Sequence, residues 1–445
     1  MTISETLRAG GPQDILGFIP HSLGYWPRQS LVAITVQGKR LGATLRVDLP
    51  RGDECTEGPD ATLSRFSETV RDYLLQDTAA DASLLAIYSS DAWSSLSERL
   101  TGLLGSLSAT LGAAGLPVRD AWFVGEERWR DAFCFDRVCC PSWGRPLSEI
   151  SDSFLSAELI LRGSRVDSGP DALVSPAATA LPAEILAEER WLGDLRLREH
   201  SRPQFLAVLE CWHRAMGDGA VLRHSRAGAL HKEANIGAYL CATLRIPAWR
   251  DAILVMAAAG AGVALVGVQD FGLFDDETDV GQTLWPWSEK ATEEPTVQEQ
   301  AGKSPRTGNG GGKVSAGFSN ALIAECGHCT PLRMRNSAPG YGEVLLGMAP
   351  SVPLWDHVEG LEAALEQCIL RGTPEAKAAA LTGKGWIEWC RGRGSYASVY
   401  LNRALVTEPG YRLAELLQDL VGRGTLCGWA GKPESAWQKF RPDPA

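Results

Sequence analysis

Two groups of cysteines stand close enough in the sequence to do chemistry together. Cys326 and Cys329 form a Cys-Gly-His-Cys motif, and Cys134, Cys139 and Cys140 fall on one short segment. Two thiols separated by two residues are typical of thiol–disulfide exchangers, and clustered thiols can also hold a metal ion. Both chemistries depend on the thiolate, so the residues around each sulfur decide between them.

The surroundings of Cys326 and Cys329 do not favour disulfide exchange. Exchangers lower the thiol pKa, usually at the first turn of a helix that follows a strand. Here Glu325 precedes the motif, where its negative charge opposes a thiolate, and Thr330-Pro331 follow it. We therefore predict two reduced thiols with no exchange activity.

A zinc site is the second chemistry that these cysteines allow. Zinc in proteins prefers four ligands. Cys134, Cys139 and Cys140 supply three, and Cys326, His328 and Cys329 could complete a tetrahedral set only if the two segments meet in space. The alternatives are a local thiol cluster or an oxidisable pair, and no other cofactor is predicted.

Three charged residues could line a small-ligand pocket. Arg46 and Asp48 lie on the polar face of a strand predicted at residues 41–49, and Asp91 follows an apolar strand at residues 84–88. Ligands often bind beyond the carboxyl ends of parallel strands. The alternative is an ion pair between Arg46 and Asp48 on a solvated face of the sheet.

Two aromatic groups could contact a protein partner. The first, in a predicted turn near the N-terminus, comprises His21, Tyr25, Trp26 and Arg28. This segment could present an aromatic and cationic surface, or it could pack its rings against the sheet. The sequence leaves both arrangements open.

The second aromatic group lies in the C-terminal helices. Tyr396 and Tyr400 accompany small residues at Ala397 and Ala404, and Pro409 ends that helix. The pattern resembles one tetratricopeptide-like helical hairpin, in which small residues let helices pack closely. Such a hairpin could form a partner-binding groove, or it could be part of a structural bundle.

The elements that must position these residues begin with an α/β domain at residues 1–175. Strands are predicted at residues 31–36, 41–49, 84–88, 121–124 and 129–135, and helices at 63–74 and 96–111. The order hairpin, helix, strand, helix, hairpin indicates a mixed sheet with flanking helices.

The remainder of the chain is predicted to be all-α. A helical middle region at residues 176–286 is followed by a polar, glycine-rich segment at 287–316 and a C-terminal helical region at 317–445. The polar segment has too little apolar content to form a core, so we predict a disordered linker. Limited proteolysis is expected to cut within residues 290–315 and to leave two resistant pieces.

Composition excludes several classes of protein. The formal net charge of −11 disfavours nucleic-acid binding, which normally uses a basic surface. The apolar run at residues 252–268 is too short to span a bilayer, and we predict a buried helix there that leads into a strand at 263–268. The N-terminus carries no secretory signal, so we expect a soluble cytoplasmic protein with reduced thiols.

Four stretches of the sequence resemble a known family. They are GFIPHSLGYWPRQSLVAITVQGKRLGATLRVDLP at residues 17–50, CFDRVCCPSWGRPL at 134–147, IPAWRDAIL at 246–254 and GWIEWCRGRGSYASVYLNRALVTEPGYRLAELL at 385–417. Together they resemble the actinobacterial family catalogued as domain of unknown function 4192. That family has no established activity, so the resemblance implies nothing about mechanism.

The function expected from the sequence is that of a non-enzymatic adaptor or regulatory protein that binds a protein partner. The sequence contains no Gly-x-Ser-x-Gly elbow, His-Glu-x-x-His motif or phosphate-binding loop. The alternative is a small-ligand-binding protein or enzyme that uses Arg46, Asp48 and Asp91.

Overall fold

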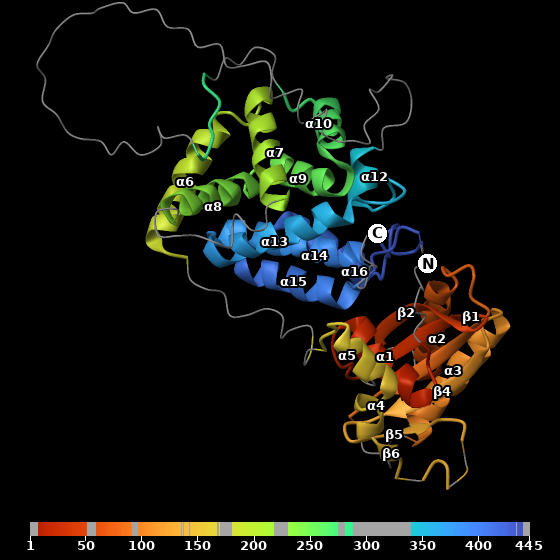
Figure 1. Cartoon of the computed structure of the whole chain (residues 1–445). Helices are drawn as coiled ribbons and strands as arrows, with labels where there is room; N and C mark the ends of the chain where they lie inside the picture. The colour runs from red at the N-terminus through yellow and green to blue at the C-terminus, as the bar shows by residue number, and fades with distance from the viewer. Residues whose placement is uncertain are drawn as a thin grey trace, which may run out of the picture. The chain divides into compact units, whose positions relative to one another are not determined.

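The chain forms two compact units, residues 1–175 and 176–445, in the computed structural model. Figure 1 shows the elements of both units. The structure describes residues 8–50, 59–90, 97–134, 136, 138–141, 143–166, 169, 180–217, 230–274, 281–287, 340–432 and 434–438. Asp91, Cys326, Cys329 and the predicted linker after Trp287 lie outside the described residues.

A six-stranded mixed sheet forms the centre of the N-terminal unit. Its strand order is β2-β1-β3-β4-β5-β6, and β3 and β4 are parallel while the other neighbours are antiparallel. The strands are β1 (Ser30–Gln37), β2 (Arg40–Asp48), β3 (Ala82–Tyr88), β4 (Val118–Val124), β5 (Arg128–Asp131) and β6 (Arg145–Pro146). The predicted mixed sheet is therefore confirmed.

Helices cover both faces of this sheet, as Figure 1 shows. Helices α2 (Pro59–Leu74) and α3 (Ser97–Ala113) bury Leu31, Leu85 and Ile87 on one face. On the other face, α1 (Pro12–Leu23) and α4 (Ser148–Ser151) bury Val32 and Ala86, while α5 (Phe154–Leu161) packs against α1. Successive strand residues point to opposite faces, which explains why β1 and β3 are apolar throughout.

The segment around His21 is a helix, and the predicted turn is wrong. Pro12 occupies the first turn of α1, where its missing N–H costs no hydrogen bond. Pro20 lies inside the helix, and Gly24 ends it in the left-handed conformation with φ of 86°. Gly24 is suited to this position because it lacks a side chain. The prolines made this segment look like a turn in the sequence.

The second unit is all-helical and has one continuous core. Its described helices are α6 (Pro182–Arg196), α7 (Arg202–Gly217), α8 (Leu230–Leu244), α9 (Pro247–Ala259), α10 (Ala261–Asp270), α12 (Tyr341–Leu345), α13 (Trp355–Arg371), α14 (Pro374–Cys390), α15 (Gly394–Thr407) and α16 (Arg412–Gly422). Buried residues from Trp191 to Trp429 belong to a single cluster. The helical middle and the C-terminal helices therefore fold together.

Helix α14 lies inside this unit. Its buried residues run almost without a break from Ala376 to Cys390, and it packs against α13, α15 and α16. Its glycines allow close approach, because a Cβ at Gly385 would lie 2.8 Å from the Leu401 side chain. A helix buried around most of its circumference is part of the core and not an exposed repeat.

The apolar run at residues 252–268 forms two helices. Helix α9 ends at Gly260, whose φ is 90°, and α10 begins immediately after it. The strand predicted at residues 263–268 is wrong, since the alanines and glycines of this run support a helix packed against α9. Every described helix is too short or too polar to cross a bilayer.

Candidate functional site

The cysteines at residues 134, 139 and 140 share one loop, which joins β5 to β6 at an edge of the sheet. β5 pairs with β4 through Trp129 and Val124, and the loop leaves the sheet after Asp131. Arg128 and Arg145 fix the return of the chain, and Arg128 Nη1 donates to the Gly144 carbonyl oxygen at 3.3 Å. Arg145 lies over the Trp129 ring at 4.9 Å and pairs with Glu149 at 2.8 Å. The sheet thus anchors both ends of this loop, residues 132–144, which we call the thiol loop.

Aspartate side chains shape the thiol loop from within. Asp131 Oδ1 accepts the backbone N–H groups of Phe133 at 2.7 Å and of Cys134 at 3.0 Å. Asp136 Oδ1 accepts the N–H of Val138 at 2.8 Å, while the Cys140 N–H donates to the Asp136 carbonyl oxygen at 2.7 Å. These local bonds are the turns that short acidic side chains stabilise. They bend the chain so that residues 134 and 140 come together.

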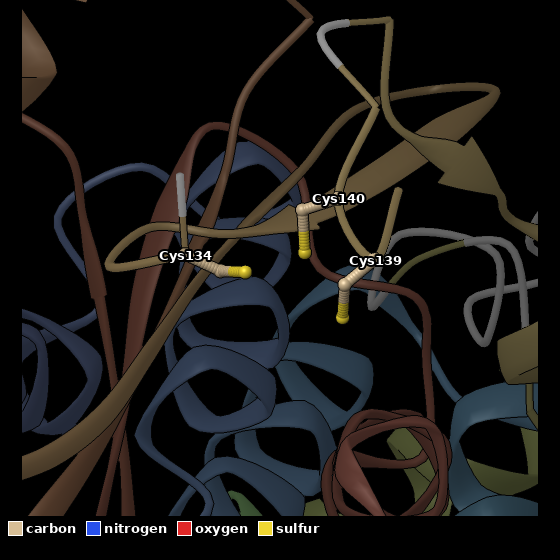
Figure 2. A group of neighbouring side chains, drawn as sticks. All are labelled: Cys134, Cys139 and Cys140. Carbon is tan, nitrogen blue, oxygen red and sulfur yellow. The ribbon is translucent and has the colours of Figure 1, made fainter. Parts of the chain in front are cut away.

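The three sulfur atoms converge. All lie within 4.8 Å of one another, and Figure 2 shows the three side chains gathered at one place. Cys140 is buried, Cys134 is half-buried and Cys139 is exposed. Burial and the neighbouring thiols of Cys134 and Cys139 raise the pKa of Cys140 to about 11. Without a bound cation, the Cys140 sulfur is therefore a protonated thiol at neutral pH.

Other cysteines of the described residues form pairs or stand alone. In the helical unit Cys241 and Cys368 share a hydrogen bond, as do Cys390 and Cys427, and all four are buried. Among the described residues, only the thiol loop brings three or more potential metal-ligating side chains together. It is also the described site where a cysteine reaches the surface.

Arg46 and Asp48 form the ion pair that the sequence allowed. Arg46 Nη2 lies 2.5 Å from Asp48 Oδ1, and the same guanidinium donates to the Arg28 carbonyl oxygen at 3.4 Å. Asp48 is largely exposed. The pair lies at the end of β2, and β5 and β6 are at the other end of the strand order. The thiol loop and this ion pair are therefore separate features.

Two buried hydroxyl groups lie near the same strand ends. Ser30 and Tyr88 are partners across β1 and β3, and both are buried. Neither Ser30 Oγ nor the Tyr88 hydroxyl has a hydrogen-bond partner among the described residues. Burial raises the pKa of Tyr88 well above its usual range, so the hydroxyl stays neutral. Trp26 packs edge-on against the Tyr88 ring at 6.2 Å.

The aromatic segment near the N-terminus packs inward. His21 and Tyr25 are buried, Trp26 is half-buried and Arg28 is exposed. The two ring nitrogens of His21 lie 3.0 Å from the hydroxyls of Ser164 and Ser156, which ties α1 to the α5 region. The histidine–serine geometry resembles a catalytic pair, but each of these side chains is shielded from solvent. Their role here is to pack helices.

Tyr396 and Tyr400 are also buried and lie beside cations. The Arg393 guanidinium stands 3.8 Å from the Tyr396 ring centroid, and Lys384 Nζ stands 4.9 Å from that of Tyr400. In this conformation the two rings are not available to a partner, because their surroundings cover them. The helical spacing of the tyrosines fits a core as well as a groove, so sequence could not separate the two.

A buried ion-pair network surrounds these tyrosines, and sequence reasoning missed it. Glu388 pairs with Arg391 at 2.9 Å and with Arg393 at 3.1 Å, and Arg391 also reaches Glu362 at 2.8 Å. Burial raises the pKa of Glu388 against the opposing effect of the two arginines. A signal was present, since Glu388 and Arg391 are three residues apart and Glu388 is flanked by the apolar residues Trp386, Ile387, Trp389 and Cys390. The charges compensate one another, which favours a structural role.

One known protein family matches most of the described residues. The family profile described as Domain of unknown function (DUF4192) matches residues 12–270 and 352–425. The chain belongs to this family. The DUF4192 match includes the thiol loop and helices α13 to α16, and it leaves out residues 271–351. No curated protein and no solved structure matches the chain.

Proposed function

We propose that this DUF4192 protein is a non-enzymatic adaptor or regulatory protein that contacts a protein partner through the thiol loop. The supporting observation is the exposure of large apolar side chains on that loop. Val138 is 92% exposed, Trp143 63% and Phe133 44%. Loops carry function when a rigid scaffold presents them, and buried aromatic side chains dominate the energy of many protein interfaces.

The energetic argument follows from the cost of exposing these side chains. Apolar surface removed from water contributes about 25 cal/mol per Å². The anchored loop leaves most of Val138 and part of Phe133 and Trp143 in the solvent, where that contribution is forgone. A partner that covers them recovers it, with little ordering cost because the loop ends are already held by β5 and β6.

The C-terminal helices offer a second contact surface. Helices α14 and α15 pack against each other. We propose that they act as a tetratricopeptide-like hairpin and that side chains on the exposed side of α15 and α16 contact the partner. Val406 of α15 is 82% exposed and Leu416 of α16 is 50% exposed. These two residues replace the buried Tyr396 and Tyr400 as the contact candidates on these helices.

The alternative function is small-ligand binding or catalysis near the strand ends. The unpartnered hydroxyls of Ser30 and Tyr88 favour it, because a buried polar atom without a hydrogen bond often marks a place where another molecule binds. Against it, the Arg46 guanidinium already bonds Asp48 and a carbonyl oxygen. A metabolite that raises the melting temperature of the wild type, with no effect on Arg46→Ala, would support this alternative over the adaptor.

Affinity capture with the full chain as bait tests the proposal. One variant changes the thiol loop (Val138→Glu with Trp143→Ala), and a second changes the helices (Val406→Glu with Leu416→Glu). Leu197→Glu is the control, since Leu197 is exposed at the end of α6. We expect a partner that the loop variant loses and that Leu197→Glu retains, and we expect the helix variant to weaken capture at the second contact surface. Retention by all three variants, or loss only from the helix variant, would contradict a contact at the thiol loop.

A further inference from the structure

We infer that Cys134, Cys139 and Cys140 together bind one thiophilic d¹⁰ metal ion, either Zn²⁺ or Cu(I). The inference rests on the convergence of three sulfurs from one loop (Figure 2). It does not depend on the proposed partner contact. Soft thiolate ligands select these ions over magnesium or calcium, which prefer oxygen.

The spacing of the sulfurs fits a single ion. Zinc–sulfur bonds of about 2.3 Å in a tetrahedron place the sulfurs about 3.8 Å apart. The thiol-loop sulfurs already lie within 4.8 Å of one another. A contraction of about 1 Å or less is within reach of side-chain rotation alone, so the backbone turns set by Asp131 and Asp136 need not change.

The number of thiolates determines the coordination that each ion can reach at this site. Three thiolates complete a trigonal site for Cu(I), whereas Zn²⁺ would keep a fourth position for water or for a ligand from another molecule. The tetrahedral site that the sequence suggested draws a ligand from the segment of Cys326, His328 and Cys329 as well. The local set needs none of them, because its three members come from the same loop.

Metal–sulfur bonds are made by thiolates, so any of the three thiols that is protonated before binding gives its proton to the solvent. Three thiolates with one Zn²⁺ ion carry a net charge of −1, and with one Cu(I) ion a net charge of −2. The exposed Cys139 gives an ion a path from solvent.

The test uses the full chain, reduced and freed of metal under anaerobic conditions. Zn²⁺ and Cu(I) are titrated in separate arms against a chromophoric chelator, and Co²⁺ serves as the spectroscopic probe for zinc. We expect one ion per chain in at least one arm, and thiolate-to-cobalt charge-transfer absorption in the Co²⁺ arm if zinc is the ion. The ion that forms the tighter complex is the metal of this site.

Three variants make the result specific. Cys139→Ser changes an exposed side chain, so the fold should survive, and we expect affinity to fall at least about a hundredfold, since even outer-shell changes cost ten- to a hundredfold. Cys211→Ala, which removes a lone buried thiol of the helical unit, should bind as the wild type does. Cys326→Ser with Cys329→Ser should also bind unchanged.

Two results would overturn the inference. Folded wild type that takes up no ion in either arm would remove the site. An ion that stays bound in Cys139→Ser, or that is lost when Cys326 and Cys329 are replaced, would assign the metal to other ligands.

Discussion

The Glu188 carboxylate accepts the backbone N–H of Thr373 at 2.8 Å, across 185 positions of the chain. Glu188 lies on α6, and Thr373 caps the first turn of α14. The same carboxylate pairs with Arg245 at 3.1 Å and is almost completely buried. One side chain therefore fastens the helices before residue 287 to the central helix after residue 340.

We predict that Glu188→Ala lowers the free energy of unfolding of the helical unit by about 3–5 kcal/mol, the usual cost of removing one partner of a buried ion pair. Glu189→Ala is the matched control. Glu189 also reaches Arg245, at 2.6 Å, but it is half-exposed, so its loss should cost about 1 kcal/mol or less. Urea unfolding followed by circular dichroism measures both, and equal costs would refute the structural role of Glu188.

Close packing of α13 against α7 makes Gly360 sensitive to a single methyl group. A Cβ at this position would lie 2.2 Å from the Met216 carbonyl oxygen. Gly360→Ala should therefore lower the free energy of unfolding by about 1–3 kcal/mol. Gly193→Ala, in open space on α6, should raise it by about 0.5–1 kcal/mol through its higher helix propensity. If Gly360→Ala raised the free energy of unfolding as Gly193→Ala does, α13 and α7 would not pack as closely as described here.

Asp77 should make the stability of the N-terminal unit depend on pH. Burial acts to raise the pKa of Asp77, but hydrogen bonds from Thr35, Gln37 and two backbone N–H groups outweigh it and the net shift is downward. A lowered carboxyl pKa stabilises the fold above the unfolded value of about 3.9, and this stability is lost as pH falls through the folded value.

The measurement for Asp77 is the melting temperature of the N-terminal unit across acid to neutral pH. Asp77→Asn should melt below the wild type at pH 7, and the two curves should converge as pH drops below about 3.9. Asp72→Asn, at an exposed position on α2, should change little at any pH. A constant gap for Asp77→Asn would mean that its charge does not matter.

Removing the unpartnered hydroxyl of Tyr88 should stabilise the protein. A buried polar group without a hydrogen bond is costly, so Tyr88→Phe should raise the free energy of unfolding by about 1 kcal/mol. Tyr239→Phe should lower it by about the same amount, because that hydroxyl accepts a hydrogen bond from Gln204 at 3.2 Å. A loss of stability in Tyr88→Phe would instead indicate a bound molecule at the hydroxyl and favour the ligand-binding alternative.

Proteolysis within residues 290–315 should yield two pieces that do not separate. The helices on both sides share one core, so the fragments should co-elute in native gel filtration and part only in denaturant. Pieces that separate without denaturant would contradict the common core.

Local patterns predicted the strands and most helices because each depends on nearby residues. The alternation at residues 41–49 and the apolar runs of β1 and β3 needed no information from elsewhere. Helix α1 was missed because Pro12 and Pro20 are read as helix breakers, although Pro12 starts this helix and Pro20 costs it one hydrogen bond. Helix α10 was missed because its valines favour a strand when packing against α9 is unknown.

The candidate site was predictable in its residues but not in its geometry. Cys134, Cys139 and Cys140 stand out in the sequence, yet their convergence depends on turns that Asp131 and Asp136 fix through backbone N–H groups. The burial of Tyr396 and Tyr400 depends on Arg393 and Lys384, whose positions follow from tertiary packing. Exposure of Val138 likewise required the fold.

The edges of the six-stranded sheet limit how any other chain can join it. On one side β6 has two residues, and one of them, Pro146, has no N–H to offer a neighbouring strand. On the other side β2 carries Arg46 and Asp48 and faces a register shift in β1. Charges, irregular register and short strands are the means by which proteins prevent strand addition. We therefore expect a molecule that binds the N-terminal unit to recognise side chains on its loops and helices, and not to extend the backbone ladder of the sheet.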